Sequence, residues 1–320
     1  MVRFLARLVA VLAASALPAL AGPPRFVSFT LENDFFAGYD RHYTNGLQAA
    51  WLVDRSDLPR ILRSAPPVRW SADPEFVVAI GQRIYTPVDI ERVIPDPADR
   101  PYAGWLYLLA DVRTQNGAIV DHVTAGVGVV GPASGARWTQ DLAHRVMGQE
   151  RAHGWSAQLE NEPTVMLGFE RTWIAVAAGH LGRRSFDVSP RAGAMLGNAL
   201  TYANLGLVAR YGENLPDDVP AGHISLGPSR DGYRGNATFG WYGWLGVDAR
   251  AVARNVFLDG STFRDSPSVD RKPWGYDYQA GVVLAWPRAR LAFTVVQRSA
   301  EFEGQGSPDR FGQLALSFAY

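Results

Sequence analysis

The feature that most constrains the fold of this chain is an alternation of apolar and polar residues with a period of two. In the final segment the residues that share one face are large and apolar: Leu314, Leu316, Phe318 and Tyr320. The residues of the other face are polar or small: Gln313, Ala315, Ser317 and Ala319. Successive side chains of a β-strand point to opposite faces, and membrane-crossing strands keep their apolar face outward. The pattern predicts an all-β fold, a transmembrane antiparallel β-barrel.

The same alternation recurs along the chain in fourteen runs. They lie near residues 26–32, 44–53, 75–84, 104–114, 119–130, 163–172, 173–183, 186–198, 200–211, 238–249, 250–258, 276–286, 291–296 and 313–320. The runs between 163 and 198 and those between 238 and 258 can each merge, so twelve strands are as defensible as fourteen. A soluble all-β domain is the alternative, because any half-buried strand alternates in this way. Closure into a barrel is favoured because no sheet edge can stay unpaired in lipid.

The N-terminus has the features of a cleavable secretory signal. Residues 1–21 contain Arg3 and Arg7, an apolar stretch, and the ending Ala19-Leu20-Ala21. The apolar stretch is too short for a membrane-spanning helix, which needs about 20 residues. We therefore expect a signal peptide at 1–21 and a single barrel domain at 22–320.

Charge and cysteine content narrow the possible partners and sites. The chain carries 31 basic and 31 acidic residues, a balance that gives no support to nucleic-acid binding. It contains no cysteine, so neither disulfides nor thiolate metal sites are available. Nothing in the sequence points to an obligate protein partner.

Loop lengths predict which end of the barrel carries the functional residues. If the N-terminus is periplasmic, the connections 33–43, 85–103 and 131–162 face outward, and their length suits extracellular loops. The connection at 115–118 contains Asn-Gly and is a tight turn at the opposite end. Residues 54–74, with four prolines, make an unusually long connection at that opposite end.

The first outward hairpin brings several oxygen-bearing side chains together. Asn33 and Asp34 follow Glu32 at the end of the first run, and Thr44 and Asn45 open the second. Carboxylate, amide and hydroxyl oxygens suit a hard cation. Asn, Asp and Gly are also ordinary turn residues, so this cluster alone does not decide between a site and a turn.

The third outward connection contains a short helical pattern from Ser134 to Met147. Gln140 and His144 are four residues apart and therefore share one face of that helix. A histidine on a helix packed against the barrel rim can act as a general base, although a lone loop histidine is more often only solvated. Glu150 follows in the same connection.

The order and spacing of these motifs resemble the LpxR-type lipid A 3′-O-deacylases along essentially the whole mature chain. The matching motifs are Asn33-Asp34, Tyr43-Thr44-x-Gly46, Ile84-Tyr85-Thr86-Pro87, Asp99-Arg100-Pro101-Tyr102-Ala103, Gly131-Pro132, Gln140-x-x-x-His144-Arg145-x-x-Gly148-x-Glu150 and Gln158-x-Glu160-Asn161. The resemblance implies a twelve-stranded barrel in the outer membrane of a Gram-negative bacterium. It also implies an enzyme that removes an acyloxyacyl chain from lipid A at the extracellular rim.

The resemblance further implies calcium dependence and a water nucleophile activated by histidine. His144 is then the general base, and Gln140, Asn33 and Thr44 match other functional positions, with Asp34 and Glu150 as the metal-site carboxylates. Arg92 corresponds to a lysine of the family pattern, and arginine is not equivalent to lysine at a tight site. The substrate is lipid A or lipopolysaccharide, surrounded by outer-membrane lipids.

Two other functions remain open at this point. The same base and metal could serve an outer-membrane phospholipase-type esterase. The other possibility is a non-enzymatic barrel, either a porin or a structural protein. A porin would need a wide polar lumen, whereas many inward positions here are Gly or Ala, which predicts a narrow barrel. A serine nucleophile is disfavoured because no G-x-S-x-G motif occurs.

Overall fold

The structure is a computed structural model, and it describes residues 26–34, 42–53, 74–216 and 238–319. The predicted signal peptide at 1–21 and most of the long connection 54–74 lie outside these ranges. Within them, no helix is both long enough and apolar enough to cross a membrane.

The secondary structure is dominated by long antiparallel strands. Their bounds are β1 Phe26–Asn33, β2 His42–Val53, β3 Glu75–Thr86, β4 Ala103–Asn116, β5 Ile119–Val130, β6 Glu162–Trp173, β7 Ala177–Leu181, β8 Arg184–Gly197, β9 Leu200–Glu213, β10 Gly240–Asn255, β11 Trp274–Ala285, β12 Ala289–Arg298 and β13 Asp309–Ala319. The helical segments are η3 Pro132–Ser134, α3 Ala136–Met147, η4 Gly154–Ala157 and α4 Val256–Asp259.

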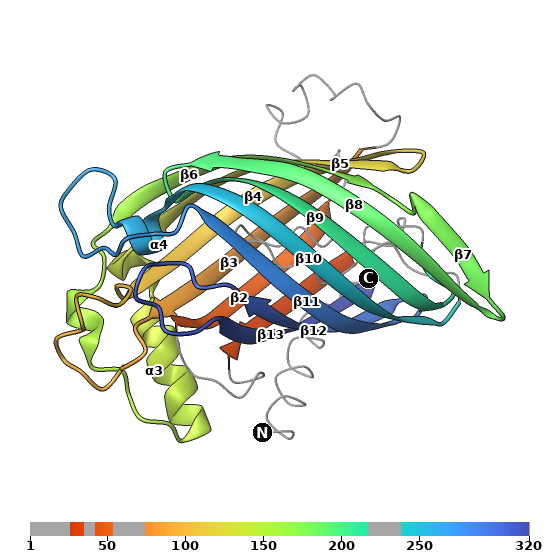
Figure 1. The fold of residues 1–320 in the computed structure, drawn as a ribbon. Helices are drawn as coiled ribbons and strands as arrows, with labels where there is room; N and C mark the ends of the chain where they lie inside the picture. The colour runs from red at the N-terminus through yellow and green to blue at the C-terminus, as the bar shows by residue number, and fades with distance from the viewer. Residues whose placement is uncertain (1–25, 35–41, 54–73, 217–237, 320) are drawn as a thin grey trace.

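Two pairings close the sheet into a barrel (Figure 1). β1 pairs with β13 along its whole length, from Phe26 opposite Ala319 to Asn33 opposite Gly312. β6 pairs with β8, so no edge remains between the two halves of the wall. The wall has twelve strands, because β7 continues the line of β6 alongside β8. The prediction of a closed antiparallel barrel is confirmed.

Two pairs of sequence runs each merge into one wall strand, for different physical reasons. Between β6 and β7, Ala175 adopts a positive φ of 52°, which interrupts the strand for a few residues. Both pieces still pair with β8, so the runs 163–172 and 173–183 form one wall strand. The runs 238–249 and 250–258 are continuous in β10 as far as Asn255. The predicted strand 250–258 is wrong in its last residues, which form α4.

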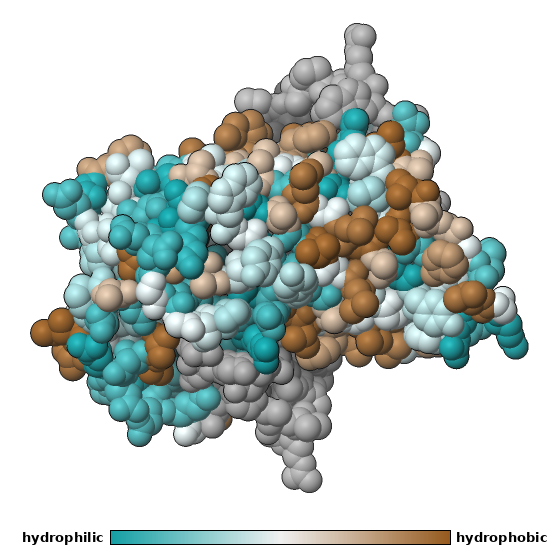
Figure 2. All heavy atoms as spheres, in the orientation of Figure 1, coloured by the Kyte–Doolittle hydropathy of each residue, from teal (hydrophilic) through white to brown (hydrophobic). Residues whose placement is uncertain are grey.

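The alternation predicted from the sequence matches the two faces of the wall. On β11 the outward residues Tyr276, Tyr278 and Val282 are exposed, whereas Asp277 and Gln279 are buried in the interior. On β13 the inward Gln313 and Ser317 are buried in the same way. Figure 2 shows apolar side chains gathered over the strands of the wall, with polar ones over the loops.

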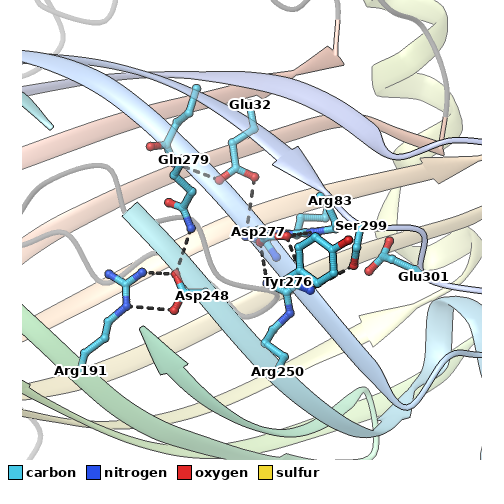
Figure 3. A network of polar contacts seen from close by, with 12 residues as sticks. Glu32, Arg83, Arg191, Asp248, Arg250, Tyr276, Asp277, Gln279, Ser299 and Glu301 are labelled. Carbon is cyan, nitrogen blue, oxygen red and sulfur yellow. Dashed lines mark hydrogen bonds and ion pairs between the residues drawn. The ribbon is translucent and has the colours of Figure 1, made fainter. Parts of the chain in front are cut away.

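Buried ion pairs fill much of the interior (Figure 3). Asp277 accepts from Arg250 at 2.5 and 2.9 Å and from Arg298 at 3.0 and 3.1 Å. Asp248 binds Arg191 and also accepts from Gln279 at 3.0 Å. A buried charge is costly unless it is paired, and each of these carboxylates has a guanidinium partner. The interior is therefore a packed polar core.

One end of this core is covered by α4. Val256, Phe257 and Leu258 are at most 1% exposed. The Phe257 ring stacks on Tyr85 of β3, with ring centroids 4.2 Å apart, and lies 5.6 Å from the Trp105 ring of β4. Since β10 and β3 are on opposite arcs of the wall, α4 reaches across the barrel mouth to pack against β3 and β4.

The connections at this mouth are the ones predicted to face outward. The chain leaves β1, β3 and β5 there, and α3 lies in the connection 131–161 that follows β5. We call this the α3 end of the barrel. The tight turn after Asn116 lies at the other end, with Gly117 at a positive φ of 59°.

Candidate functional site

Two glycines with positive φ delimit α3. Gly135 before the helix has φ 71°, and Gly148 after it has φ 71° and donates its backbone N–H to the carbonyl of His144. Glycine reaches this left-handed conformation without the steric cost of a Cβ. Arg145 lies in the last turn, where a cationic side chain interacts favourably with the helix dipole. The prediction of a helix from Ser134 to Met147 is confirmed, apart from its first two residues.

The helix packs on the outer face of the wall, against β3 and β4. A Cβ on Gly104 would lie 2.2 Å from both the Ala136 Cβ and the Ser134 Oγ, so the helix start fits closely only because residue 104 has no side chain. Gln82 Nε2 also donates to the Ser134 carbonyl at 2.6 Å. A small buried cluster completes the contact: Ile84, Tyr102, Ala136, Ala152 and Trp155.

His144 is buried on α3 and has a defined hydrogen bond to the connection that follows the helix. Its side chain is 3% exposed, and its Nδ1 is bonded to the backbone carbonyl of Glu150. A carbonyl oxygen can only accept, so Nδ1 carries the proton and the Nε2 of a neutral imidazole keeps its lone pair. The turn at Gly148 returns the chain to His144, where Gln149 N donates to the His144 carbonyl at 2.9 Å. The local fold thus selects the tautomer that a general base at Nε2 requires.

Gln140 lies one helical turn before His144 and is 2% exposed. Its Oε1 accepts from Trp155 Nε1 at 2.6 Å. An indole N–H can only donate, so the orientation of the amide is fixed and Nε2 is its free end. Among the described residues Gln140 Nε2 has no hydrogen-bond partner. A buried donor of this kind is costly to leave unsatisfied, and it can bind an acceptor brought by a ligand.

The first hairpin meets the same face of the wall as α3. Asn33 pairs with Asn45, Asn45 with Ile84, and Ile84 with Gly104. Asn33 follows the inward-facing Glu32, so its side chain faces outward. It lies in the same cross-strand row as Ile84 and Gly104, the residues that α3 covers. The register of β2 slips between Tyr43 and Asn45. Such bulges are frequent beside active sites. This slip falls at Thr44.

Asp34 and Glu150 are in different environments. Asp34, directly after β1, is 2% exposed. Glu150 is exposed, its carbonyl accepts from His144, and its carboxylate lies beside that of Glu91. The Glu150 hydrogen bond and charge raise the pKa of the Glu91 carboxyl above its ordinary value. Glu91 was not predicted from the sequence, because only the folded connections bring residues 91 and 150 together.

Arg92 lies at the surface of the same connection. Its Nη1 is 3.2 Å from Asp96 Oδ2, and the two side chains are 48% and 50% exposed. The Arg92 carbonyl lies beside Gly154, so its backbone is near the connection that follows α3 while its guanidinium is bonded to Asp96. Arg83 on β3 is a buried cation that pairs in register with Gly46 of the first hairpin. Its side chain faces the interior, however, and its Nη2 lies 3.6 Å from the Glu32 carboxylate.

The neighbouring Tyr102 anchors the two outward connections to each other. Burial raises its pKa to about 12, so the phenol is neutral at physiological pH. Its hydroxyl donates to the Ile90 carbonyl at 3.3 Å, and its ring lies 5.0 Å from that of Trp155. Tyr102 therefore supports Trp155 and, through it, the orientation of Gln140.

The oxygen-bearing side chains of these connections are of the chemical type that binds a hard cation. Asp34 supplies a buried carboxylate, Asn33 an amide oxygen, and Glu150 with Glu91 a pair of carboxylates in contact. Oxygen ligands of this type bind calcium. Across the described part of the chain, no group of three or more His, Asp or Glu side chains is close enough to form a metal cluster by itself. A cation here would need amide, hydroxyl or backbone oxygens besides the carboxylates.

One comparison with known proteins identifies the family. The model of the family described as "Outer membrane protein LpxR" matches residues 4–320. The solved structure "LpxR from Salmonella typhimurium" has a TM-score of 0.75 at 20% identity, covering 92% of this chain and 99% of that one. The β domain of the Bordetella autotransporter BrkA has a TM-score of 0.46 at 10% identity, covering 92% of this chain and 98% of that one. No curated protein sequence matches the chain. The chain therefore belongs to the LpxR family of outer-membrane proteins, located in the outer membrane of Gram-negative bacteria.

Proposed function

We propose that this protein is a lipid A 3′-O-deacylase, which hydrolyses the ester that links an acyloxyacyl chain to lipid A. The observation that carries the proposal is the arrangement on α3. His144 is buried with Nδ1 bonded to the Glu150 carbonyl, and Gln140 Nε2 is a free donor one turn away on the same face. A base and an oxyanion donor at this spacing are what ester hydrolysis by water requires.

The reaction then proceeds in two proton transfers through one residue. His144 Nε2 takes a proton from a water molecule, whose oxygen forms a bond to the ester carbonyl carbon. Gln140 Nε2 donates to the carbonyl oxygen as it becomes negative. When the bond to the leaving oxygen breaks, the imidazolium returns its proton to that oxygen, which gives a free hydroxyl on the sugar and a fatty acid. The Glu150 carbonyl stabilises the imidazolium between these steps.

Calcium is the cofactor that we propose for this site. Asp34 would hold it, with Asn33, Thr44 and the Glu150 carboxylate as further oxygen donors. When bound, it would supply a positive charge that stabilises the developing oxyanion. Arg92 is the cation of the neighbouring connection, and we assign it a contact with a substrate phosphate, which an arginine can bind bidentately.

The position of the site fits a lipid substrate. Gln140 and His144 lie on the buried face of α3, at the seam between this helix and the connection that follows it, rather than in the barrel interior. A lipid in the surrounding leaflet can approach this seam laterally, without entering the barrel. Lipid A lies in the outer leaflet, so the α3 end would be the extracellular one.

The site alone does not distinguish lipid A from other lipid esters, so a phospholipase-type esterase is the second candidate. A porin is disfavoured by a specific observation, the packing of Phe257 against Tyr85 across the mouth of the barrel. Mass spectrometry of lipid A and phospholipids from cells with and without the protein separates these functions. A deacylase gives lipid A lighter by one acyloxyacyl chain, with phospholipids unchanged. Loss of phospholipid acyl chains instead, or no change in either lipid, would overturn the proposal.

A further inference from the structure

The helix α3 is amphipathic in the opposite sense to a helix on a soluble protein. Its buried face carries Ala136, Gln140 and His144, which are at most 3% exposed. The opposite face carries large apolar residues at the same four-residue spacing: Trp138 at 67%, Leu142 at 41% and Val146 at 49% exposed. Helical residues in soluble proteins normally turn such a stripe toward the core. We call Trp138, Leu142 and Val146 the α3 stripe.

The buried face explains why the stripe points outward. The helix start packs against Gly104 through the small side chain of Ala136. The hydrogen bond from Trp155 requires Gln140 to face the connection that follows the helix. With a period of 3.6 residues, positions 138, 142 and 146 then lie on the far side of the helix. A contiguous apolar stripe left in water is unfavourable and usually marks a contact surface.

We propose that the α3 stripe is immersed in the acyl chains of the outer leaflet, so that α3 is an interfacial helix. The first argument is continuity with a lipid-facing surface. α3 packs on β3 and β4, and farther along these strands the outward Ile80 and Leu108 are 41% and 51% exposed. The stripe therefore extends an apolar surface that already faces lipid.

The second argument is orientation and charge. In Figure 1 α3 runs away from the barrel wall, crosswise to the barrel axis, as a helix in the plane of a membrane interface does. Arg137 and Arg145 are exposed beside the stripe, and Asp141 is the one acidic residue of the helix. Arginines at this level can bind anionic lipid headgroups while the stripe enters the chains. Trp138 suits the boundary because its ring is apolar and its N–H is polar.

The absence of cysteine from the chain allows a direct test. Single variants Leu142→Cys and Asp141→Cys would carry a nitroxide label on adjacent residues of α3. The purified barrel is placed in vesicles of lipopolysaccharide and phosphatidylethanolamine, after a heat-modifiability gel shows that it is folded. Label accessibility is measured to oxygen, which concentrates in lipid, and to a nickel chelate, which stays in water. Leu108→Cys provides the lipid-facing reference.

The proposal expects Leu142→Cys to resemble Leu108→Cys, accessible to oxygen and protected from nickel, whereas Asp141→Cys shows the reverse. Val146→Cys should behave like Leu142→Cys and serves if that variant folds poorly. Equal nickel accessibility at 141 and 142 would overturn the proposal, because the stripe would then be in water. Low accessibility to both reagents at 142 would also overturn it, by showing that a second protein surface covers the stripe. None of these results depends on lipid A hydrolysis.

Discussion

Trp155 donates its indole N–H to Oε1 of Gln140 at 2.6 Å, and this bond determines which end of the Gln140 amide is free. Without the indole, the amide could rotate by half a turn and present an oxygen where the proposed reaction needs a donor. An acceptor beside a developing oxyanion would repel it. Trp155 is therefore a positioning residue for the chemistry assigned to Gln140.

The first prediction follows from this bond. Trp155→Phe keeps the ring contact with Tyr102 but removes the donor, so we expect kcat to fall roughly 3- to 10-fold, matching a hydrogen bond worth about 0.5–1.5 kcal/mol. Gln140→Ala removes the oxyanion donor and should cost on the order of 10²–10³-fold. If Trp155 acts through Gln140, the double variant is no slower than Gln140→Ala. Additive losses would mean that Trp155 contributes only to packing.

The second prediction concerns the docking of α3 on the wall. Gly104→Val places atoms where Ala136 and Ser134 lie 2.2 Å from an added Cβ, so the helix start must move. We expect deacylation to fall at least tenfold, because misplacing a catalytic group by about 1 Å costs on the order of 10²-fold. The barrel itself should keep its heat-modifiable gel shift. The matched control is Gly243→Ala, whose new Cβ would meet only the Gly281 carbonyl at 3.9 Å. Full activity in Gly104→Val would contradict the tight fit.

The third prediction tests the metal. Activity should be lost in a chelator and restored by calcium, and Asp34→Asn should require much more calcium for half-maximal rate. The folded barrel should survive both treatments, since its stability comes from the hydrogen-bonded wall. Arg92→Ala should leave the calcium requirement unchanged and weaken only substrate binding. Unchanged turnover in chelator would remove calcium from the mechanism.

The fourth prediction uses the carboxylate pair of Glu91 and Glu150. The contact raises the pKa of Glu91, so the protonated form is favoured in the folded loops and the pair is stabilised at low pH. This contribution is lost as the pH rises through the raised pKa, where both groups become charged and repel. In the presence of a chelator, Glu91→Gln should therefore make the connection 131–161 more resistant to proteolysis than in the wild type at pH 8. At pH 4 the two proteins should be cleaved at nearly the same rate. The same difference at both pH values would show that charge is not the cause.

Much of the barrel could be predicted from the sequence, because lipid imposes one rule on every wall residue. The period-two alternation therefore placed residues such as Tyr276 outward and Asp277 inward. The continuity of β6 and β7 could not be predicted, because it depends on a three-residue interruption at Ala175 that only the shared pairing with β8 resolves. The short α4 falls within the predicted strand 250–258, because its apolar residues fit a wall strand and only the Phe257 contact with Tyr85 distinguishes the two.

Only some of the local geometry around the candidate site could be predicted. The four-residue spacing of Gln140 and His144 depends only on helix geometry, so their shared helix face followed from the sequence, whereas the burial of that face did not. Trp155 and Glu91 were missed, because each acts across a connection and no local pattern marks it. The exposed position of Arg92, bonded to Asp96, also depends on how its loop folds.

The central claim is that His144 is the general base, and the most direct test is the rate of purified His144→Asn on lipid A. The substitution keeps a polar side chain but has no basic nitrogen, so we expect a loss of about 10²–10⁴-fold. His153→Asn, an exposed histidine of the same connection, is the control and should keep a near wild-type rate. If folded His144→Asn deacylates lipid A as fast as wild type while His153→Asn does not, the base is His153 and the account of this site is wrong.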